Sequence, residues 1–232
     1  MDSLLTYTCE EGVATLAMDD GKANVMSVAM LGALNAGLDR AEQEARLVVL
    51  QGRAGMFSGG FDLAVFKRGG AEVQEMLEGG ARLSERLLGY PLPVIAACSG
   101  HAIAMGAFLL LSADLRIGLA AGARFQVNEV RIGMTVPHFA LEVCRQRLTP
   151  AQLHNAAVLG VPFNPQKALA AGFLDELVTT EELAATVKRH AADLLSLNAE
   201  AFAATKRRLR ATTLANMAEA IKADMLDWQK LV

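Results

Sequence analysis

The first fifty residues show the apolar and polar patterns of two strands and a helix. Leu4–Cys9 and Val13–Met18 are two short segments rich in strand-forming residues, and the turn at residues 10–12 between them predicts a hairpin. Ser27 is a good helix-capping residue, and apolar side chains follow it at helical spacing as far as about Glu44. We therefore expect a hairpin that runs into an amphipathic helix.

Strands that read as buried on both faces then alternate with helices. Leu47–Gln51 and Val94–Cys98 are continuously apolar, which is typical of strands covered on both sides. This alternation predicts an α/β fold with parallel strands. The other predicted elements are helices at Ala71–Leu88 and about Met105–Ala113, and strands at Leu115–Leu119 and Arg124–Val127.

The second half of the chain is predicted to be helical. Thr149-Pro150 with Gln152, Asn164-Pro165 before Gly172, and Thr179 with Glu182 are three helix-start signatures. Residues 179–232 then consist almost entirely of helix formers, and we expect them to pack on their own core or on another subunit. Their apolar stripe comprises Leu209, Leu214, Met217, Ile221, Met225 and Trp228.

The apolar stretch from Val94 to Ala113 also has the hydrophobicity of a membrane span. It contains Ser99, Gly100 and Gly106, however, and Asp114 follows it directly. A buried strand, a turn and a buried helix explain these small and polar residues better than one spanning helix. We therefore expect no membrane association.

The composition of the chain narrows the possible partners, binding sites and cellular setting. The 232 residues carry a net charge of −3, which offers no general attraction for nucleic acid. Aromatic residues make up only 5%, so the core is aliphatic. Three widely spaced cysteines without a CxxC pair predict neither a disulfide framework nor a zinc site, and favour a reducing cytoplasmic setting. The basic cluster of Lys206, Arg207, Arg208 and Arg210 is either a solvated helix face or a phosphate contact.

Several common catalytic motifs do not occur in the sequence. It has no nicotinamide-binding GxGxxG after a strand, no GxxxxGK[ST] phosphate loop, no HExxH zinc helix and no GxSxG nucleophile elbow. The four histidines have no metal-ligand spacing. These absences favour chemistry that needs neither a metal nor a redox cofactor.

Three segments in register resemble the crotonase (enoyl-CoA hydratase/isomerase) superfamily. They are Met56–Leu63 (MFSGGFDL), Pro93–Gly106 (PVIAACSGHAIAMG) with Ala113-Asp114 after it, and Arg124–Gly133 (RFQVNEVRIG). Ala168–Val178 supports the resemblance, which runs from about Gly12 to the end of the chain. It implies a spiral of β–β–α turns with a crotonase-like acyl-CoA-binding core at 1–178 and a C-terminal helical trimerisation region at 179–232. A homotrimer or dimer of trimers is expected, acting on acyl-CoA thioesters without any other cofactor.

By this resemblance, the backbone N–H groups of Phe61 and Met105 are the donors that hold a thioester oxygen. Negative charge develops there when a neighbouring carbon loses a proton, and removing one such donor costs roughly 3–4 kcal/mol in other enzymes. Asp62 is expected to cap a helix or fix its loop. The other residues that the resemblance places around the substrate are Lys22, Ala23, Asn24, Ser58, Gly59, Gly60, Asp62, Leu63, Gly106 and Phe108.

One carboxylate selects the reaction. Hydratases of the superfamily use two glutamates, but Phe108 stands at the first of these positions and only Glu129 remains. A single base can move a proton between C2 and C4 of an enoyl thioester, as in the isomerase branch, which Asn128-Glu129 resembles. An apolar neighbour such as Phe108 would raise the pKa of Glu129. The alternative for Glu129 is a structural role, either an ion pair with Arg131 on the same strand face or the capping of a turn.

Three functions are therefore compared. The leading one is an enoyl-CoA isomerase with Glu129 as the proton shuttle. The second is another reaction of the same fold, either hydration with a substitute acid or hydrolysis of the thioester. The third is a catalytically degenerate acyl-CoA-binding subunit.

Overall fold

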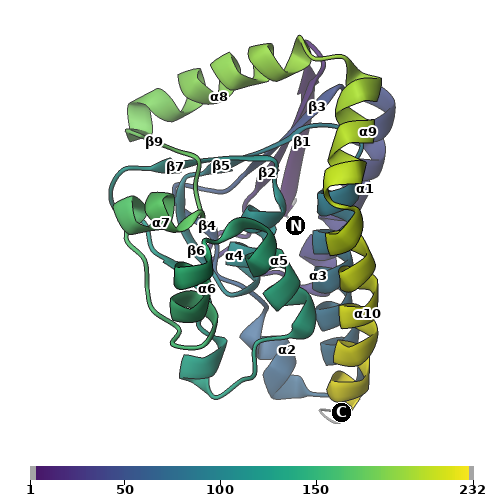
Figure 1. The fold of residues 1–232 in the computed structure, drawn as a ribbon, viewed down its shortest axis with the longest axis vertical. Helices are drawn as coiled ribbons and strands as arrows, with labels where there is room; N and C mark the ends of the chain where they lie inside the picture. Colours follow the sequence, from purple (N-terminus) through teal and green to yellow (C-terminus); the bar gives the residue numbers. More distant parts are fainter. Residues whose placement is uncertain (1–3, 230–232) are drawn as a thin grey trace.

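The computed structural model describes residues 4–229 as two sheets wrapped by helices (Figure 1). Only β1 and β2 pair antiparallel; the other neighbouring strands of both sheets are parallel. The large sheet has the order β1 (Leu5–Glu10), β2 (Val13–Met18), β3 (Leu47–Gln51), β5 (Val94–Cys98), β7 (Leu115–Leu119) and β9 (Glu176–Val178). The small sheet has the order β4 (Gly55–Ser58), β6 (Gly100–Ile103) and β8 (Phe125–Gln126).

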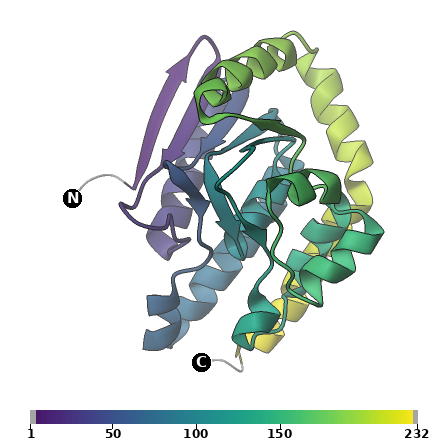
Figure 2. The same cartoon turned by 90° about the vertical axis from the view of Figure 1, so that its left-hand side faces the viewer.

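Helices cover both faces of the large sheet, which explains its continuously apolar central strands. Along β3, Val48 and Leu50 face the main core, whereas Leu47 and Val49 belong to a second cluster with residues of α8. Figure 2 shows the chain from the side, with the strands enclosed by helices. The helices are α1 (Val28–Glu44), α2 (Leu63–Arg68), α3 (Ala71–Gly89), α4 (Met105–Ser112), the 3-10 turn η1 (Glu129–Ile132), α5 (His138–Arg147), α6 (Pro150–Ala157), α7 (Pro165–Ala171), α8 (Thr180–Leu195), α9 (Ala199–Leu209) and α10 (Ala211–Trp228).

The predicted α/β pattern is confirmed for the hairpin, the central strands and most helix starts. Ser27 caps α1, Asn164 caps α7, and Thr179 forms a capping box with Glu182. The box predicted at Thr149 is wrong. The N–H of Thr149 donates to the Ala171 carbonyl, so it is not free to donate to the side chain of Gln152 as a capping box requires.

The apolar stretch at 94–113 forms β5, β6 and α4, as the small and polar residues within it indicated. None of the helices in residues 4–229 has the length and apolarity required to cross a membrane. The predicted strand at Arg124–Val127 shortens to the two residues of β8. The sequence interpretation also missed β4, β6, β9 and α5.

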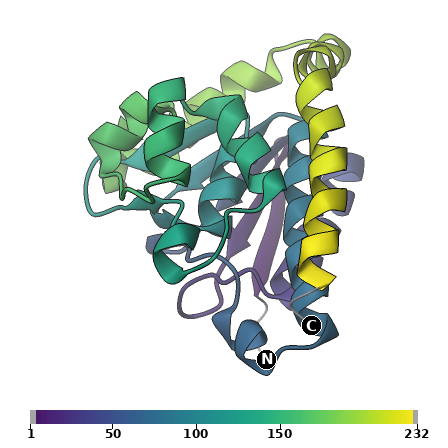
Figure 3. The same cartoon turned by 60° about the horizontal axis from the view of Figure 1, so that its bottom comes forward.

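The C-terminal helices pack on the chain's own core. Met217, Ile221 and Trp228 are buried where α10 lies beside α3 and α5, whereas Leu209 is 79% exposed and does not belong to the stripe (Figure 3). The buried carboxylate of Asp224 on α10 accepts the first two N–H groups of α5, each at 2.8 Å. The N-terminus of α5 is thus held by α10 of the same chain.

Two members of the basic cluster are structural. Neither a solvated helix face nor a phosphate contact therefore describes the whole cluster. Lys206 and Arg210 are buried and bind the Asp114 carboxylate at 2.7 and 2.9 Å. Burial lowers the pKa of Lys206 to about 8. Arg207 and Arg208 point to solvent. The Asp114 contacts fasten the junction of α9 and α10 to the residues after α4.

Candidate active site

The loop between β4 and α2 leaves one backbone donor without a partner. The N–H of Gly59 donates to the Ala23 carbonyl at 2.8 Å, and the N–H of Gly60 donates to the Ser58 hydroxyl at 3.2 Å. The Gly60 carbonyl accepts from the N–H of Met26 at 2.8 Å. Within residues 4–229 nothing accepts from the N–H of Phe61. That donor is therefore available to a ligand.

A second free donor stands at the start of α4. The N–H of Ala104 donates to the Gln126 carbonyl at 2.8 Å, whereas that of Met105, the first residue of the helix, finds no acceptor in the described part of the chain. The turn places Ala104 at a φ of 50°, a backbone conformation that residues other than glycine rarely adopt. The positive end of the α4 dipole adds to the attraction for a developing negative charge.

The two donor segments touch. A methyl group built on Gly60 would lie 3.5 Å from the Met105 nitrogen and 2.9 Å from the Ala104 methyl. A methyl on Gly106 would meet the Ser58 carbonyl oxygen at 2.3 Å. Gly60 and Gly106 are therefore required by the close approach of the two segments, whereas a methyl on Gly59 would meet Ala23 at 3.3 Å. The structure brings Phe61 and Met105 together, and their role toward a thioester remains a prediction.

Glu129 is a buried carboxylate with an unused oxygen. The residue is 6% exposed, and its Oε2 atom has no hydrogen-bond partner among the described residues. Burial raises the pKa of Glu129 from its ordinary value of 4.5 to about 7, while a hydrogen bond from its own backbone lowers it slightly. The predicted direction of the shift is confirmed. The neighbouring Asn128 also has an unpartnered Oδ1.

Two expectations about the surroundings of Glu129 are wrong. The residue begins the 3-10 turn η1 rather than lying on a strand, because β8 ends at Gln126 and the Asn128 carbonyl accepts from the N–H of Arg131. Arg131 does not neutralise Glu129. Its Nε atom donates to the Gly160 carbonyl at 2.5 Å, and no ion pair of Glu129 occurs within residues 4–229.

Phe108, which the resemblance placed at the position of a second hydratase acid, forms an apolar wall. Its side chain is 1% exposed and packs edge-on against Phe139, with ring centroids 5.8 Å apart. Phe139 in turn meets Trp228 of α10 at 6.3 Å. The last helix therefore supports this wall.

The segment expected to meet the coenzyme is a rigid loop. Asn24 is buried at a φ of 48°, and its side chain donates to the Met18 and Phe57 carbonyls at 3.0 and 3.3 Å. That side chain serves the fold, so a ligand would meet the backbone edge of Ala23 and the exposed side chain of Lys22 instead.

The chain's similarity to known proteins agrees with this geometry. The family model described as Enoyl-CoA hydratase/isomerase matches residues 8–231. The chain belongs to this family. A probable enoyl-CoA hydratase of Rhodobacter capsulatus is 30% identical over 89% of this chain and 81% of that protein.

Two solved structures show the same fold. That of probable enoyl-CoA hydratase EchA3 from Mycobacterium tuberculosis has a TM-score of 0.94 and 42% identity, covering 97% of this chain and 96% of the other. A second structure of the same M. tuberculosis protein, described there as an enoyl-CoA isomerase, has a TM-score of 0.91 and 43% identity, covering 96% and 97%. The crotonase-like fold and the acyl-CoA enzyme class are thus confirmed.

Two residues that support the site, Asp20 and Arg53, were missed from the sequence, and Ser58, which the sequence placed around the substrate, supports the site as well. The Asp20 carboxylate accepts the N–H groups of Lys22, Asn24 and Val25 at 2.8–2.9 Å, and those bonds lower its pKa against the effect of burial. Arg53 donates to the Lys22 carbonyl at 3.0 Å. The Ser58 hydroxyl joins the same network. The turn-forming run at residues 19–21 was the available signal for Asp20. Asp62 caps α2 as predicted, while Leu63 is 58% exposed.

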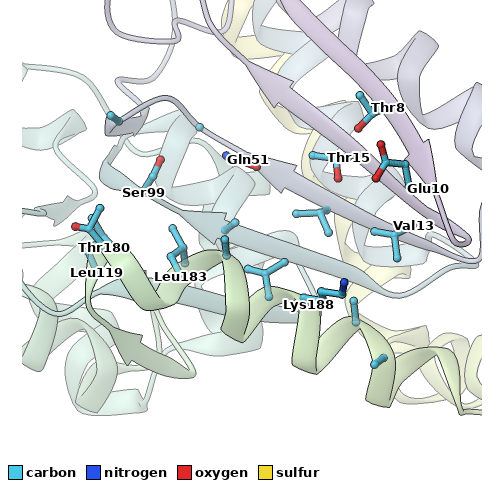
Figure 4. A pocket seen from close by; sticks show the side chains of 18 of the residues that line it. Thr8, Glu10, Val13, Thr15, Gln51, Ser99, Leu119, Thr180, Leu183 and Lys188 are labelled. Carbon is cyan, nitrogen blue, oxygen red and sulfur yellow. The ribbon is translucent and has the colours of Figure 1, made fainter.

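A cavity of about 820 Å³ lies between α8 and the large sheet (Figure 4). Its wall combines aliphatic side chains of α8 with Thr8, Thr15 and Gln51 of the sheet. It includes neither Glu129 nor the two donor residues. We therefore locate the candidate chemistry by the unpartnered donors and carboxylate rather than by this hollow. No cluster of metal-binding side chains occurs in the part of the chain that the structure describes.

Proposed function

We propose that this enzyme moves a double bond from C3 to C2 of an acyl-CoA thioester, with Glu129 as its single base. The buried, unpartnered Oε2 of Glu129 carries the proposal. The ionised carboxylate would remove a proton from C2, and the charge of the resulting dienolate would spread to the thioester oxygen. The N–H groups of Phe61 and Met105 would hold that oxygen. Glu129 would then return the proton to C4, which completes the shift.

The apolar residue at position 108 favours isomerisation over hydration. Adding water requires one group to activate it and another to supply a proton, and Phe108 offers neither. A base with a pKa of about 7 suits a shuttle, because it accepts and releases a proton with similar ease near neutral pH. One M. tuberculosis protein is described as a hydratase in one structure and as an isomerase in another, so the reaction requires a direct assay.

The proposal is tested by supplying purified protein with 3-enoyl-CoA thioesters of several chain lengths. We expect the ultraviolet absorbance of the conjugated 2-enoyl-CoA to appear. Separate incubation with 2-enoyl-CoA in water should yield little 3-hydroxyacyl-CoA or free coenzyme A. Absence of the conjugated product at every chain length would overturn the isomerase proposal. Rapid formation of the hydroxy product or of free coenzyme A would instead establish one of the other reactions.

The activity should depend on pH through Glu129. Only the carboxylate form removes a proton, so kcat/KM for the 3-enoyl-CoA should rise with pH and level off above about 7. Because the pKa is raised in the folded protein, the same group should lower the free energy of unfolding as pH rises from 4.5 to about 7. Rate profiles and urea unfolding between about pH 4 and 8 measure both effects. A rate inflection near 4.5 would show that Glu129 titrates as an ordinary carboxyl.

Assembly and setting are part of the proposal. We expect a homotrimer or a dimer of trimers in the cytoplasm, with coenzyme A entering only as part of the substrate. Exposed apolar side chains on η1 and at the end of α6 give a surface suited to such contacts. They are Val130, Ile132, Val158 and Leu159.

A further inference from the structure

The hydroxyl of Ser58 is fully buried and bonded in two directions. It donates to the Asn24 carbonyl at 2.7 Å and accepts from the N–H of Gly60 at 3.2 Å. The first bond fixes the direction of the hydroxyl, and the hydroxyl then fixes the peptide that precedes Gly60. Ser58 therefore joins the rigid loop around Asn24 to the segment that carries Phe61.

Gly60 is the flexible point that this bond controls. Its φ is 100°, and glycine without a side chain has no steric preference for that value. The bond from its N–H to Ser58 restrains φ, while the bond from Met26 to its carbonyl restrains ψ. In a trans peptide the next N–H points opposite to the carbonyl. The two bonds together set the direction of the free N–H of Phe61.

Ser58 also touches the second donor segment. The backbone of α4 passes so close that a methyl on Gly106 would lie 2.3 Å from the Ser58 carbonyl oxygen and 2.8 Å from its Cβ atom. Gly106 follows Met105 directly, so any movement of Ser58 is transmitted to both donors.

We propose that Ser58 is a positioning residue that holds the Phe61 and Met105 N–H groups in mutual alignment. This inference rests on the proposed role of those groups toward the thioester oxygen. Ser58 itself does not touch the reacting atoms. Removing its hydroxyl would leave the N–H of Gly60 and the carbonyl of Asn24 unpaired in a buried place, and the peptide would turn to find other partners. Misaligned donors stabilise the enolate less, whereas the uncharged thioester is bound almost as before.

Ser58→Ala is the direct test, and Ser112→Ala is its matched control. Ser112 is equally buried, but its hydroxyl only donates to the Phe108 carbonyl one turn earlier in α4. We expect Ser58→Ala to reduce kcat for 3-enoyl-CoA by about 10- to 100-fold, less than the loss of a whole donor, with KM changed by less than about threefold. Ser112→Ala should retain kcat.

An enolate readout separates this inference from the isomerase proposal. The enolate of acetoacetyl-CoA has an absorbance band in the ultraviolet. Aligned donors stabilise this enolate and should therefore increase the band when the thioester binds. We expect the wild type and Ser112→Ala to enhance it, and Ser58→Ala to bind the thioester with much less enhancement. If the wild type shows the band but no isomerisation, the isomerase proposal fails and this inference stands. Wild-type enhancement and kcat in Ser58→Ala, or an equal loss in Ser112→Ala, would overturn the positioning role.

Discussion

Glu129→Gln should lower kcat for 3-enoyl-CoA isomerisation by about 10²- to 10⁴-fold, the range that general-base catalysis contributes. Glutamine keeps the shape of the side chain but cannot accept a proton from C2. Glutamine fills the same buried place, and the Glu129 Oε2 that it replaces has no partner among the described residues. The substitution should therefore leave the affinity for the thioester unchanged. Removing this buried charge should also raise the free energy of unfolding at pH 8 by up to about 3 kcal/mol, as expected from the raised pKa.

Glu142→Gln provides a matched control for this prediction. Glu142 lies on α5 with little exposure, but its carboxylate pairs with Arg145 and Asn216. Its substitution should leave turnover near wild type. Steady-state kinetics, thioester binding and urea unfolding of both variants supply the comparison. Wild-type turnover in Glu129→Gln would remove Glu129 from the reaction, whatever the stability data show.

Gly60→Ala should reduce kcat by about 10²- to 10³-fold, comparable with the loss of one oxyanion donor. The new methyl would lie 2.9 Å from the Ala104 Cβ atom and 3.1 Å from the Ile103 carbonyl, so the two donor segments must separate. The positive φ of Gly60 adds strain, and we expect a loss of roughly 1–3 kcal/mol in stability.

Gly55→Ala distinguishes backbone strain from displacement of the donors. Gly55 has a φ of 78°, but a methyl built there meets no atom within 4 Å. This variant should lose a similar backbone contribution to stability and keep its turnover, as measured by thermal unfolding and steady-state kinetics. If both glycine variants lost activity equally, steric separation of the donors would not be the cause.

The sequence predicted those parts of the fold that local patterns determine. Buried strands such as Val94–Cys98 and capped helices such as that after Ser27 have signals within a few residues. The short strands β4 and β6 have little pattern of their own, because they form only when distant segments pair. The capping box at Thr149 failed for a similar reason, since the competing acceptor belongs to Ala171.

In the candidate site, too, local patterns revealed some residues, whereas contacts between distant segments were not predictable. Motif spacing was enough to nominate Phe61, Met105 and Glu129, and the raised pKa of Glu129 followed from its apolar setting. The 3-10 turn of Glu129 and the engagement of Arg131 with Gly160 depend on α6 and the loop after it, which no local signal places nearby. The supporting roles of Asp20 and Ser58 arise from hydrogen bonds across the fold, so spacing does not reveal them.

The contact between Gly60 and Ala104 has a genetic consequence. The space between the two donor segments holds one methyl group, and Ala104 already fills it. The effect of adding a side chain at position 60 must therefore depend on which residue occupies position 104. Ala104→Gly would remove the closest clash of Gly60→Ala while leaving the Ile103 carbonyl in place. The two positions are an epistatic pair, and substitutions at either can be interpreted only with the identity of the other.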